Sequence, residues 1–285
     1  MQVLILKPAG YCYGVIHAIN QAKEIKQNNP DKRVVVFGLL VHNKTVQDEL
    51  AALGIETLDI SNKDPYPELD KFNQDDAIIF TAHGHPKKYE EILDKKGIKY
   101  YDLTCFKVQQ TFELIKEAKE IIYIGKKGHP ETTTALTMNP SIHLYDIQDG
   151  IDYAKIKTKD PIIINQTTLS FLELRDIHQE IQKKLPDAII TNEICDAAYL
   201  RQKALKELDD SYDAIIVIGS KLSSNSNKLY QLALHYHPTK KNYFIENKQD
   251  LGNQKLDFQK VVLVSGTSVP PAVINEIATY LKEGK

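Results

Sequence analysis

The sequence of 285 residues contains three cysteines, and they are almost evenly spaced. Cys12, Cys105 and Cys195 lie 93 and 90 residues apart, and no two of them form a CxxC pair. An odd number of cysteines cannot pair completely in disulfides within one chain. If these residues do chemistry, they must converge from distant parts of the sequence.

Three thiolates that meet at one point suit a metal centre. A structural zinc ion normally takes four ligands. An iron–sulfur cluster also usually takes four cysteines, so three cysteines on a four-iron cluster would leave one iron without a protein ligand. Three thiols without a metal are the alternative, because free cysteine is often simply a buried small side chain. The spacing alone leaves both interpretations open.

The segments around the cysteines repeat along the chain. Each cysteine follows an apolar segment (VLILKPAGYC, IKYYDLTC, AIITNEIC) and precedes a segment with helical periodicity. Further apolar strands, polar loops and helices follow in the same order in each copy. The alternation predicts an α/β protein of three similar small domains with parallel sheets, at residues 1–98, 99–190 and 191–285. One larger sheet with accidental periodicity is the alternative.

Polar side chains follow the predicted strands in all three units. In parallel α/β sheets, ligands bind at the carboxyl ends of the strands. The residues at these positions are Cys12, His42 and His83 in the first unit, Cys105, His129, Glu131 and Thr167 in the second, and Cys195, Ser223, Ser224, Asn225 and Ser268 in the third. If the units are arranged about a pseudo-threefold axis, all of these side chains face one central cavity.

The residue types at these positions suggest an anion site with a proton donor. Imidazoles together with serine and asparagine donors suit a diphosphate, and SKLSSNSNKL begins a predicted helix whose free N–H groups attract phosphate. A helix N-cap or a polar loop is the alternative for that segment. Glu131, in GHPE, would have a raised pKa in a closed cavity beside an anion, which suits a proton donor. A surface glutamate at a helix start is the alternative.

Composition describes an ordinary soluble globular protein. Hydrophobic residues make up 42% and charged residues 26%, and the formal net charge is −2. Bulk electrostatics therefore indicate neither a nucleic-acid nor a membrane partner. No apolar stretch reaches the roughly 20 residues of a membrane span, and the N-terminus lacks a signal-peptide pattern. We expect a cytoplasmic protein.

Several short motifs occur in a characteristic order between Tyr11 and Ser268. They are GYCYGV, VHN, TAHG, DLTC, GHPE, NQTTLS, NEIC, GSKLSSNSN and SGTS. Together they resemble the LytB-type 4-hydroxy-3-methylbut-2-enyl diphosphate reductases, which end the methylerythritol phosphate route to isoprenoids. The resemblance implies three α/β domains around one [4Fe–4S] cluster with three cysteine ligands. It also implies a reductive dehydroxylation with two electrons and two protons, yielding isopentenyl and dimethylallyl diphosphates.

The resemblance assigns roles to the matched residues. Cys12, Cys105 and Cys195 would bind the cluster. The substrate diphosphate would be held by His42, His83, His129, Ser223, Ser224, Asn225 and Ser268. Glu131 would deliver protons to the hydroxyl end of the substrate, and Thr167 would position that group. A flavodoxin or ferredoxin is the implied electron donor, because the sequence has no flavin or nicotinamide motif.

Three positions depart from the family pattern. Phe106 and Lys107 follow Cys105 where the family has proline, His85 follows TAHG where an apolar residue is commoner, and TTTA at 132–135 replaces a glycine-containing stretch. These positions flank the matched residues, so they bear on cluster exposure and loop geometry. An iron–sulfur sensor and a zinc-dependent hydrolase are the rival functions. A sensor has no need of a proton donor such as Glu131.

Overall fold

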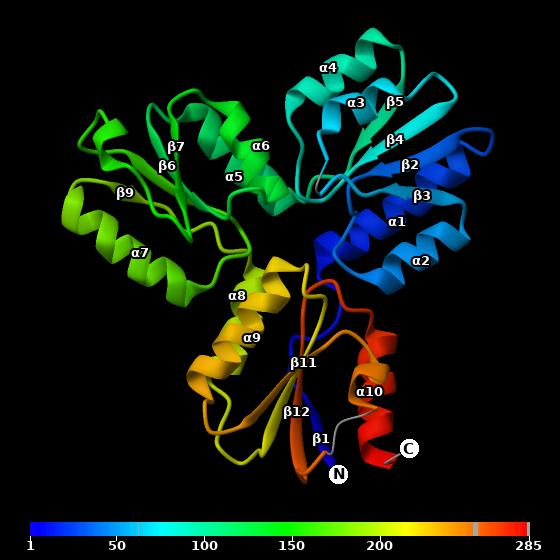
Figure 1. Cartoon of the computed structure of the whole chain (residues 1–285), viewed down its shortest axis with the longest axis vertical. Coiled ribbons are helices and arrows are strands. Elements are labelled where there is room, and N and C mark those ends of the chain that lie inside the picture. Colours follow the sequence, from blue (N-terminus) through cyan, green and yellow to red (C-terminus); the bar gives the residue numbers. More distant parts are fainter. Residues whose placement is uncertain (62, 253–255, 284–285) are drawn as a thin grey trace.

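The chain forms three lobes that meet at the centre of the molecule (Figure 1). The computed structural model describes residues 1–61, 63–252 and 256–283. Each lobe contains one four-stranded sheet, and all strand pairs within the sheets are parallel. The predicted α/β class with three similar parallel sheets is therefore confirmed.

The first sheet has the strand order β3-β2-β4-β5. Its strands are β2 (Arg33–Phe37), β3 (Ile55–Leu58), β4 (Asp76–Phe80) and β5 (Lys99–Asp102). The helices of this part of the chain are α1 (Tyr13–Asn28), α2 (Lys44–Ala52), α3 (Pro65–Asp70) and α4 (Lys87–Lys95).

The second sheet has the equivalent order β7-β6-β8-β9. Its strands are β6 (Ile121–Gly125), β7 (Ile142–Asp146), β8 (Ile162–Asn165) and β9 (Ile189–Ile190). The helices are α5 (Phe106–Glu117), α6 (Pro130–Met138), η1 (Tyr153–Lys155) and α7 (Phe171–Lys184).

The third sheet has the order β1-β12-β10-β11 and combines both ends of the chain. Its strands are β1 (Gln2–Ile5), β10 (Ala214–Ile218), β11 (Lys241–Ile245) and β12 (Lys260–Ser265). The helices are α8 (Asp196–Lys206), α9 (Ser224–Tyr236), η2 (Lys248–Leu251) and α10 (Pro271–Glu283).

Two strands lie in a different sheet from the one that the predicted units 1–98, 99–190 and 191–285 assign. β1 pairs with β12, so it belongs to the third sheet and not to the first. β5 pairs with β4, so it belongs to the first sheet and not to the second. The repeat marks each strand–cysteine–helix segment, but the strand is the edge of the preceding sheet. As limits of separately folding domains, the boundaries near 98 and 190 stay predictions.

Continuous apolar runs explain why the sheets are covered on both faces. In β2, the side chains of Val34 and Val36 join one buried cluster, whereas those of Val35 and Phe37 join another on the opposite face. Such two-sided burial is typical of parallel strands between helices. The same arrangement recurs in β10, where Ile216 and Ile215 lie in different clusters.

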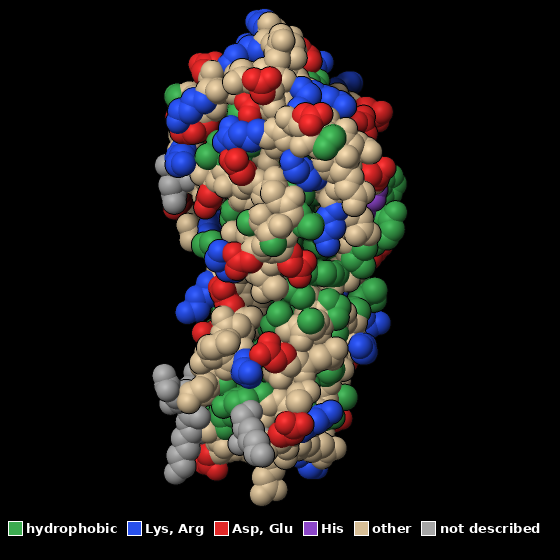
Figure 2. Space-filling model, turned by 90° about the vertical axis from the view of Figure 1, so that its right-hand side faces the viewer, with side chains coloured by type: hydrophobic (Ala, Val, Ile, Leu, Met, Phe, Trp, Pro, Cys, Tyr) green, Lys and Arg blue, Asp and Glu red, His purple; other side chains and the backbone are tan. Residues whose placement is uncertain are grey.

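The surface shows no concentration of one charge on the face in Figure 2. Lysine and arginine side chains alternate there with aspartate and glutamate, in agreement with a formal net charge of −2. Within residues 1–61, 63–252 and 256–283, no helix has the length and apolar character needed to cross a membrane.

The third sheet offers a direct test of the fold. Leu263 is 1% exposed in β12 and pairs with both Ile5 and Ile216. We expect Leu263→Ala to lower the free energy of unfolding by about 2–5 kcal/mol, because it leaves a cavity in a packed core. Urea denaturation followed by circular dichroism measures the loss. Leu222→Ala, at a side chain that is 70% exposed, is the control and should change the stability by less than about 0.5 kcal/mol. Equal losses in the two variants would contradict the assigned packing.

Candidate active site

The three cysteines lie where the chain crosses from one lobe to the next. Cys12 joins β1 of the third sheet to α1, Cys105 joins β5 to α5, and Cys195 joins β9 to α8. Each cysteine is the N-cap residue of its helix. The chain passes between the lobes near the centre of the molecule, where the three lobes meet (Figure 1).

The backbone holds the three cysteines in equivalent ways. Each cysteine N–H donates to a backbone carbonyl that lies just after an inner strand. That strand belongs to the sheet from which the chain crosses to the next lobe. The acceptors are the carbonyls of Thr267, Ala82 and Thr167, at 3.0, 3.0 and 2.9 Å for Cys12, Cys105 and Cys195 respectively. This repeated contact gives the three side chains a common setting at the helix N-termini, which favour negative charge.

The sulfur atoms are near enough to influence one another. A Cβ atom placed on Gly14 would lie only 2.7 Å from Sγ of Cys105, so the Cys105 thiol rests against the segment that carries Cys12. Burial raises the pKa of both the Cys12 and the Cys105 thiols, and the charges of neighbouring cysteines raise it further. All three cysteines are free and half-buried.

The three cysteines are of the residue type that holds iron–sulfur clusters. Within the described part of the chain, no three His, Cys, Asp or Glu side chains are grouped closely enough to hold one metal ion. The ligands of an iron–sulfur cluster bind different irons and so are separated by the body of the cluster. Half-buried thiols at three helix N-termini are compatible with the cysteine ligands that such a cluster takes.

Glu131 and Thr167 form a buried hydrogen-bonded pair. The Thr167 N–H and hydroxyl donate to the two carboxylate oxygens of Glu131, both at 2.8 Å, and the Tyr123 hydroxyl donates at 3.2 Å. Glu131 is only 1% exposed, so the alternative of a surface glutamate is wrong. Burial raises the pKa of Glu131 to about 7, although the three hydrogen bonds act in the opposite direction.

The three predicted histidines form one cluster. The ring centroids of His42 and His83 are 5.0 Å apart, and those of His83 and His129 are 5.8 Å apart. Burial lowers the pKa of His129 to about 3 and also lowers the pKa of His42 and His83. Burial therefore disfavours the charged form of all three imidazoles. Nδ1 of His42 and Nδ1 of His129 are buried without a hydrogen-bond partner among the described residues.

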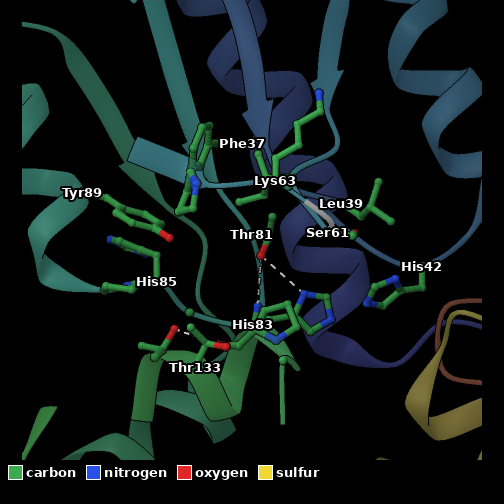
Figure 3. Close-up of a pocket in the computed structure, with 18 residues that line it drawn as sticks. Phe37, Leu39, His42, Ser61, Lys63, Thr81, His83, His85, Tyr89 and Thr133 are labelled. Atoms are coloured by element: carbon green, nitrogen blue, oxygen red, sulfur yellow. Dashed lines mark hydrogen bonds between the residues drawn. The ribbon is translucent and has the colours of Figure 1, made fainter. Parts of the chain in front are cut away.

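A cavity opens beside the histidine cluster. It has a volume of about 200 Å³, and both His42 and His83 line it. Figure 3 shows these two rings beside Thr81, whose hydroxyl lies 3.4 Å from Nδ1 of His83. Phe37 and Tyr89 line a more apolar part of the same cavity.

The start of α9 contributes hydroxyl and amide groups. Ser223 accepts a hydrogen bond from the Ser226 N–H and so caps the helix, as the N-cap interpretation expects; its role toward a ligand stays a prediction. The Ser224 hydroxyl accepts from Thr168 at 3.0 Å. The amide group of Asn225 and the hydroxyl of Ser268 are buried without partners within the described structure. Because an unpaired buried polar group is costly, these atoms are suited to bind a polar ligand.

Comparison with known proteins decides the family. A family model described as LytB protein matches residues 3–282. The chain belongs to the LytB family. Proteins named 4-hydroxy-3-methylbut-2-enyl diphosphate reductase are 36% identical in Bacillus licheniformis and 37% identical in Bacillus subtilis, and each match covers 99% of this chain and 91% of the relative.

Solved structures agree with the LytB assignment. The E-1-hydroxy-2-methyl-but-2-enyl-4-diphosphate reductase of Plasmodium falciparum is similar with a TM-score of 0.82 and 25% identity, over 99% of this chain and 87% of that one. A second solved structure, of an (E)-4-hydroxy-3-methyl-but-2-enyl diphosphate reductase, has a TM-score of 0.68 and 27% identity, over 99% of this chain and 100% of that one.

The structure of this LytB-family chain also shows polar residues that the sequence motifs did not single out. Tyr123 donates to Glu131, while Gln166 and Thr168 both donate to the Ser224 hydroxyl. The repeat contained a signal for Thr168. It follows the carbonyl that binds Cys195, just as His83 and Ser268 follow the carbonyls that bind the other two cysteines. Tyr123 gave no signal, because it lies inside an apolar strand.

The departures from the LytB pattern are accommodated locally. Phe106 is 66% exposed at the first residue of α5, while the Lys107 ammonium lies 3.2 Å from the Glu193 carboxylate. The His85 ring stacks on Phe80, with centroids 3.7 Å apart. Residues 132–135 lie within α6, where Thr132 donates to Gln166 at 3.2 Å.

Gly14 provides a test of how closely the cysteine segments approach. We expect Gly14→Ala to lose most of the iron and sulfide bound after anaerobic reconstitution, because the added methyl group would displace the Cys105 sulfur. Metal and sulfide analysis measures the loss, and circular dichroism checks the fold. Gly252→Ala, in a turn of the third lobe, is the matched control and should bind normally. Full iron and sulfide in Gly14→Ala would disprove the close approach.

Proposed function

We propose that this LytB-family chain is a 4-hydroxy-3-methylbut-2-enyl diphosphate reductase. The observation that carries the proposal is the electrostatic coupling of the three N-cap cysteines at the lobe crossings, one of which, Cys195, is linked through Thr167 to the buried carboxyl group of Glu131. Relatives that match 99% of this chain over 91% of their own length carry this enzyme name. In the reaction, the allylic C–O bond breaks and the hydroxyl leaves as water with one proton. Two electrons and a second proton form a new C–H bond, giving isopentenyl or dimethylallyl diphosphate.

Cys12, Cys105 and Cys195 would hold one [4Fe–4S] cluster per chain. The fit rests on their half-buried positions, their helix N-termini and their mutual electrostatic influence. When bound, such a cluster supplies electrons and one iron that has no protein ligand. An external ferredoxin or flavodoxin would deliver those electrons, since the chain carries no flavin or nicotinamide motif.

The unpartnered polar atoms support a diphosphate site. The proposed ligands are His42, His83, His129, Ser223, Ser224, Asn225 and Ser268. Among them, His42, His129, Asn225 and Ser268 have buried nitrogen or oxygen atoms without a partner in the described structure. A bound anion would supply acceptors for these groups and raise the pKa of the imidazoles, so that charged hydrogen bonds form.

Glu131 would act as the proton donor. Its carboxyl group is almost fully buried, and a pKa of about 7 keeps a large fraction protonated near neutral pH. The Thr167 hydroxyl, 2.8 Å from the carboxyl, would orient both the acid and the substrate hydroxyl. Tyr123 fixes the other side of the carboxyl group.

Anaerobic purification tests the proposed function. We expect iron and acid-labile sulfide in the ratio of a four-iron cluster, and consumption of 4-hydroxy-3-methylbut-2-enyl diphosphate with a chemical reductant and mediator. Mass spectrometry of the two diphosphate products measures turnover. A protein that holds the cluster but does not act on this substrate would favour a sensor, and zinc without sulfide would favour a hydrolase.

Substitution of the proposed acid should separate binding from chemistry. We expect Glu131→Gln to retain the cluster and the substrate affinity but to lower kcat by about 10²–10⁴, because a glutamine cannot donate the proton. Steady-state kinetics and substrate titration measure the two effects. Glu113→Gln, at a side chain that is 65% exposed, is the matched control. Near-normal turnover in Glu131→Gln would remove Glu131 from this role.

The pKa of Glu131 predicts the pH dependence. Because the protonated acid is the active form, kcat should be level at low pH and fall as the pH rises through a pKa of about 7 or above. A bound diphosphate shifts this fall in kcat to higher pH, because a negative charge raises the pKa of a nearby acid. The kcat–pH profile measures the fall, and Glu131→Gln should lack it. An identical fall in that variant would assign the titration to another group.

A further inference from the structure

Arg201 joins two of the cysteine segments. It lies on α8, six residues after Cys195, and is only 4% exposed. Its Nη1 donates to the Ala197 carbonyl at 2.7 Å, and its Nη2 donates to the Gly10 carbonyl at 2.6 Å. Ala197 comes two residues after Cys195, and Gly10 comes two residues before Cys12. The guanidinium therefore lies between the chain segments of these two cysteines.

The charge of Arg201 is not paired with any carboxylate that the structure describes. Within the described residues, no acidic side chain is within ion-pair distance, and Nε is buried without a hydrogen-bond partner. The groups that favour its charged form are the thiols of Cys12 and Cys195. A buried guanidinium without a counter-ion is costly. A negative charge located at the cysteines would compensate it.

Comparison of the three cysteine junctions shows that Arg201 has a special position. At each junction, which is a place where the segments of two cysteines meet, the residue six positions after one cysteine lies near the residue two positions before the other. For Cys195 and Cys12, these residues are Arg201 and Gly10. The Thr111 hydroxyl contacts Glu193, whose charge is paired with Lys107. Ala18 and Leu103 belong to the same apolar core. Among the described residues, the junction with Arg201 is the one of the three that carries a charge not balanced by a side chain of opposite sign.

We infer that Arg201 is the counter-charge of the three-cysteine centre. Its two carbonyl contacts hold the Cys12 and Cys195 segments together, and its positive charge balances the thiolates that bind the cluster. The inference rests on the proposed function, because it needs the cluster to be present. A fixed positive charge favours the more negative, reduced cluster, so Arg201 raises the reduction potential. Arg201 is thus a positioning residue that acts through the cluster and does not touch the substrate.

Two substitutions separate the charge from the side chain. Arg201→Gln retains a hydrogen-bond donor without the charge, whereas Arg201→Lys retains the charge without the planar fork. We expect the midpoint potential of the reconstituted cluster to decrease in the order wild type, Arg201→Lys, Arg201→Gln. Redox titration followed by visible absorbance and electron paramagnetic resonance measures this order without turnover. Lys203→Gln, at an exposed lysine on the same helix, is the matched control and should leave the potential unchanged.

If the substitutions prevent cluster assembly, the cluster content becomes the measurement. Circular dichroism first establishes that the variants are folded, and iron and sulfide per folded chain should then fall in the same order. Arg201→Lys that behaves no better than Arg201→Gln, or Arg201→Gln that equals the wild type, would overturn the inference. If the wild-type chain binds no cluster, the proposed function fails as well. A wild-type cluster with an unchanged potential in Arg201→Gln overturns the role of Arg201 alone.

Discussion

The contact on which the site depends is the hydrogen bond from each cysteine N–H to a carbonyl at the end of a neighbouring strand. It is made three times, once at each crossing between lobes, and each time it places a thiol at the start of a helix. The sheets are held together by apolar cores of their own. The crossings also fix the position of each lobe relative to its neighbour. At each crossing, the cysteine is hydrogen-bonded to one sheet and the helix that begins there belongs to the next lobe.

The arrangement also separates the tasks of the site. Buried imidazoles at His42 and His129 and the unpartnered Asn225 amide are prepared for a polar ligand. Glu131 is prepared for proton transfer by burial and by its contact with Thr167. Both sets lie at carboxyl ends of strands, as parallel sheets require. Burial therefore lowers the pKa of the histidines and raises the pKa of Glu131, so it disfavours the charged form of both kinds of group.

Much of this organisation could be predicted from the sequence, for identifiable reasons. The spacing of Cys12, Cys105 and Cys195 revealed the repeat, and apolar runs such as RVVVF predicted buried parallel strands. The sheet membership of β1 and β5 could not be predicted, because local pattern defines a strand but not its distant partner. Tyr123 lies among isoleucines in β6 and looked like core, and Arg201 looked like an ordinary polar residue of a helix. Their roles depend on contacts between distant segments.

The pairing of β1 with β12 has a consequence for how the protein is made. The first strand leaves the ribosome long before its partner has been translated, so Cys12 cannot reach its final position until the last sheet is complete. The carbonyl of Thr267, which fixes Cys12, also comes late. Folding during synthesis generally proceeds from the N-terminus, but here the cysteine set is completed only at the end. The three thiols of the proposed cluster site can therefore be in place together only after Thr267 has been translated and β12 has paired with β1.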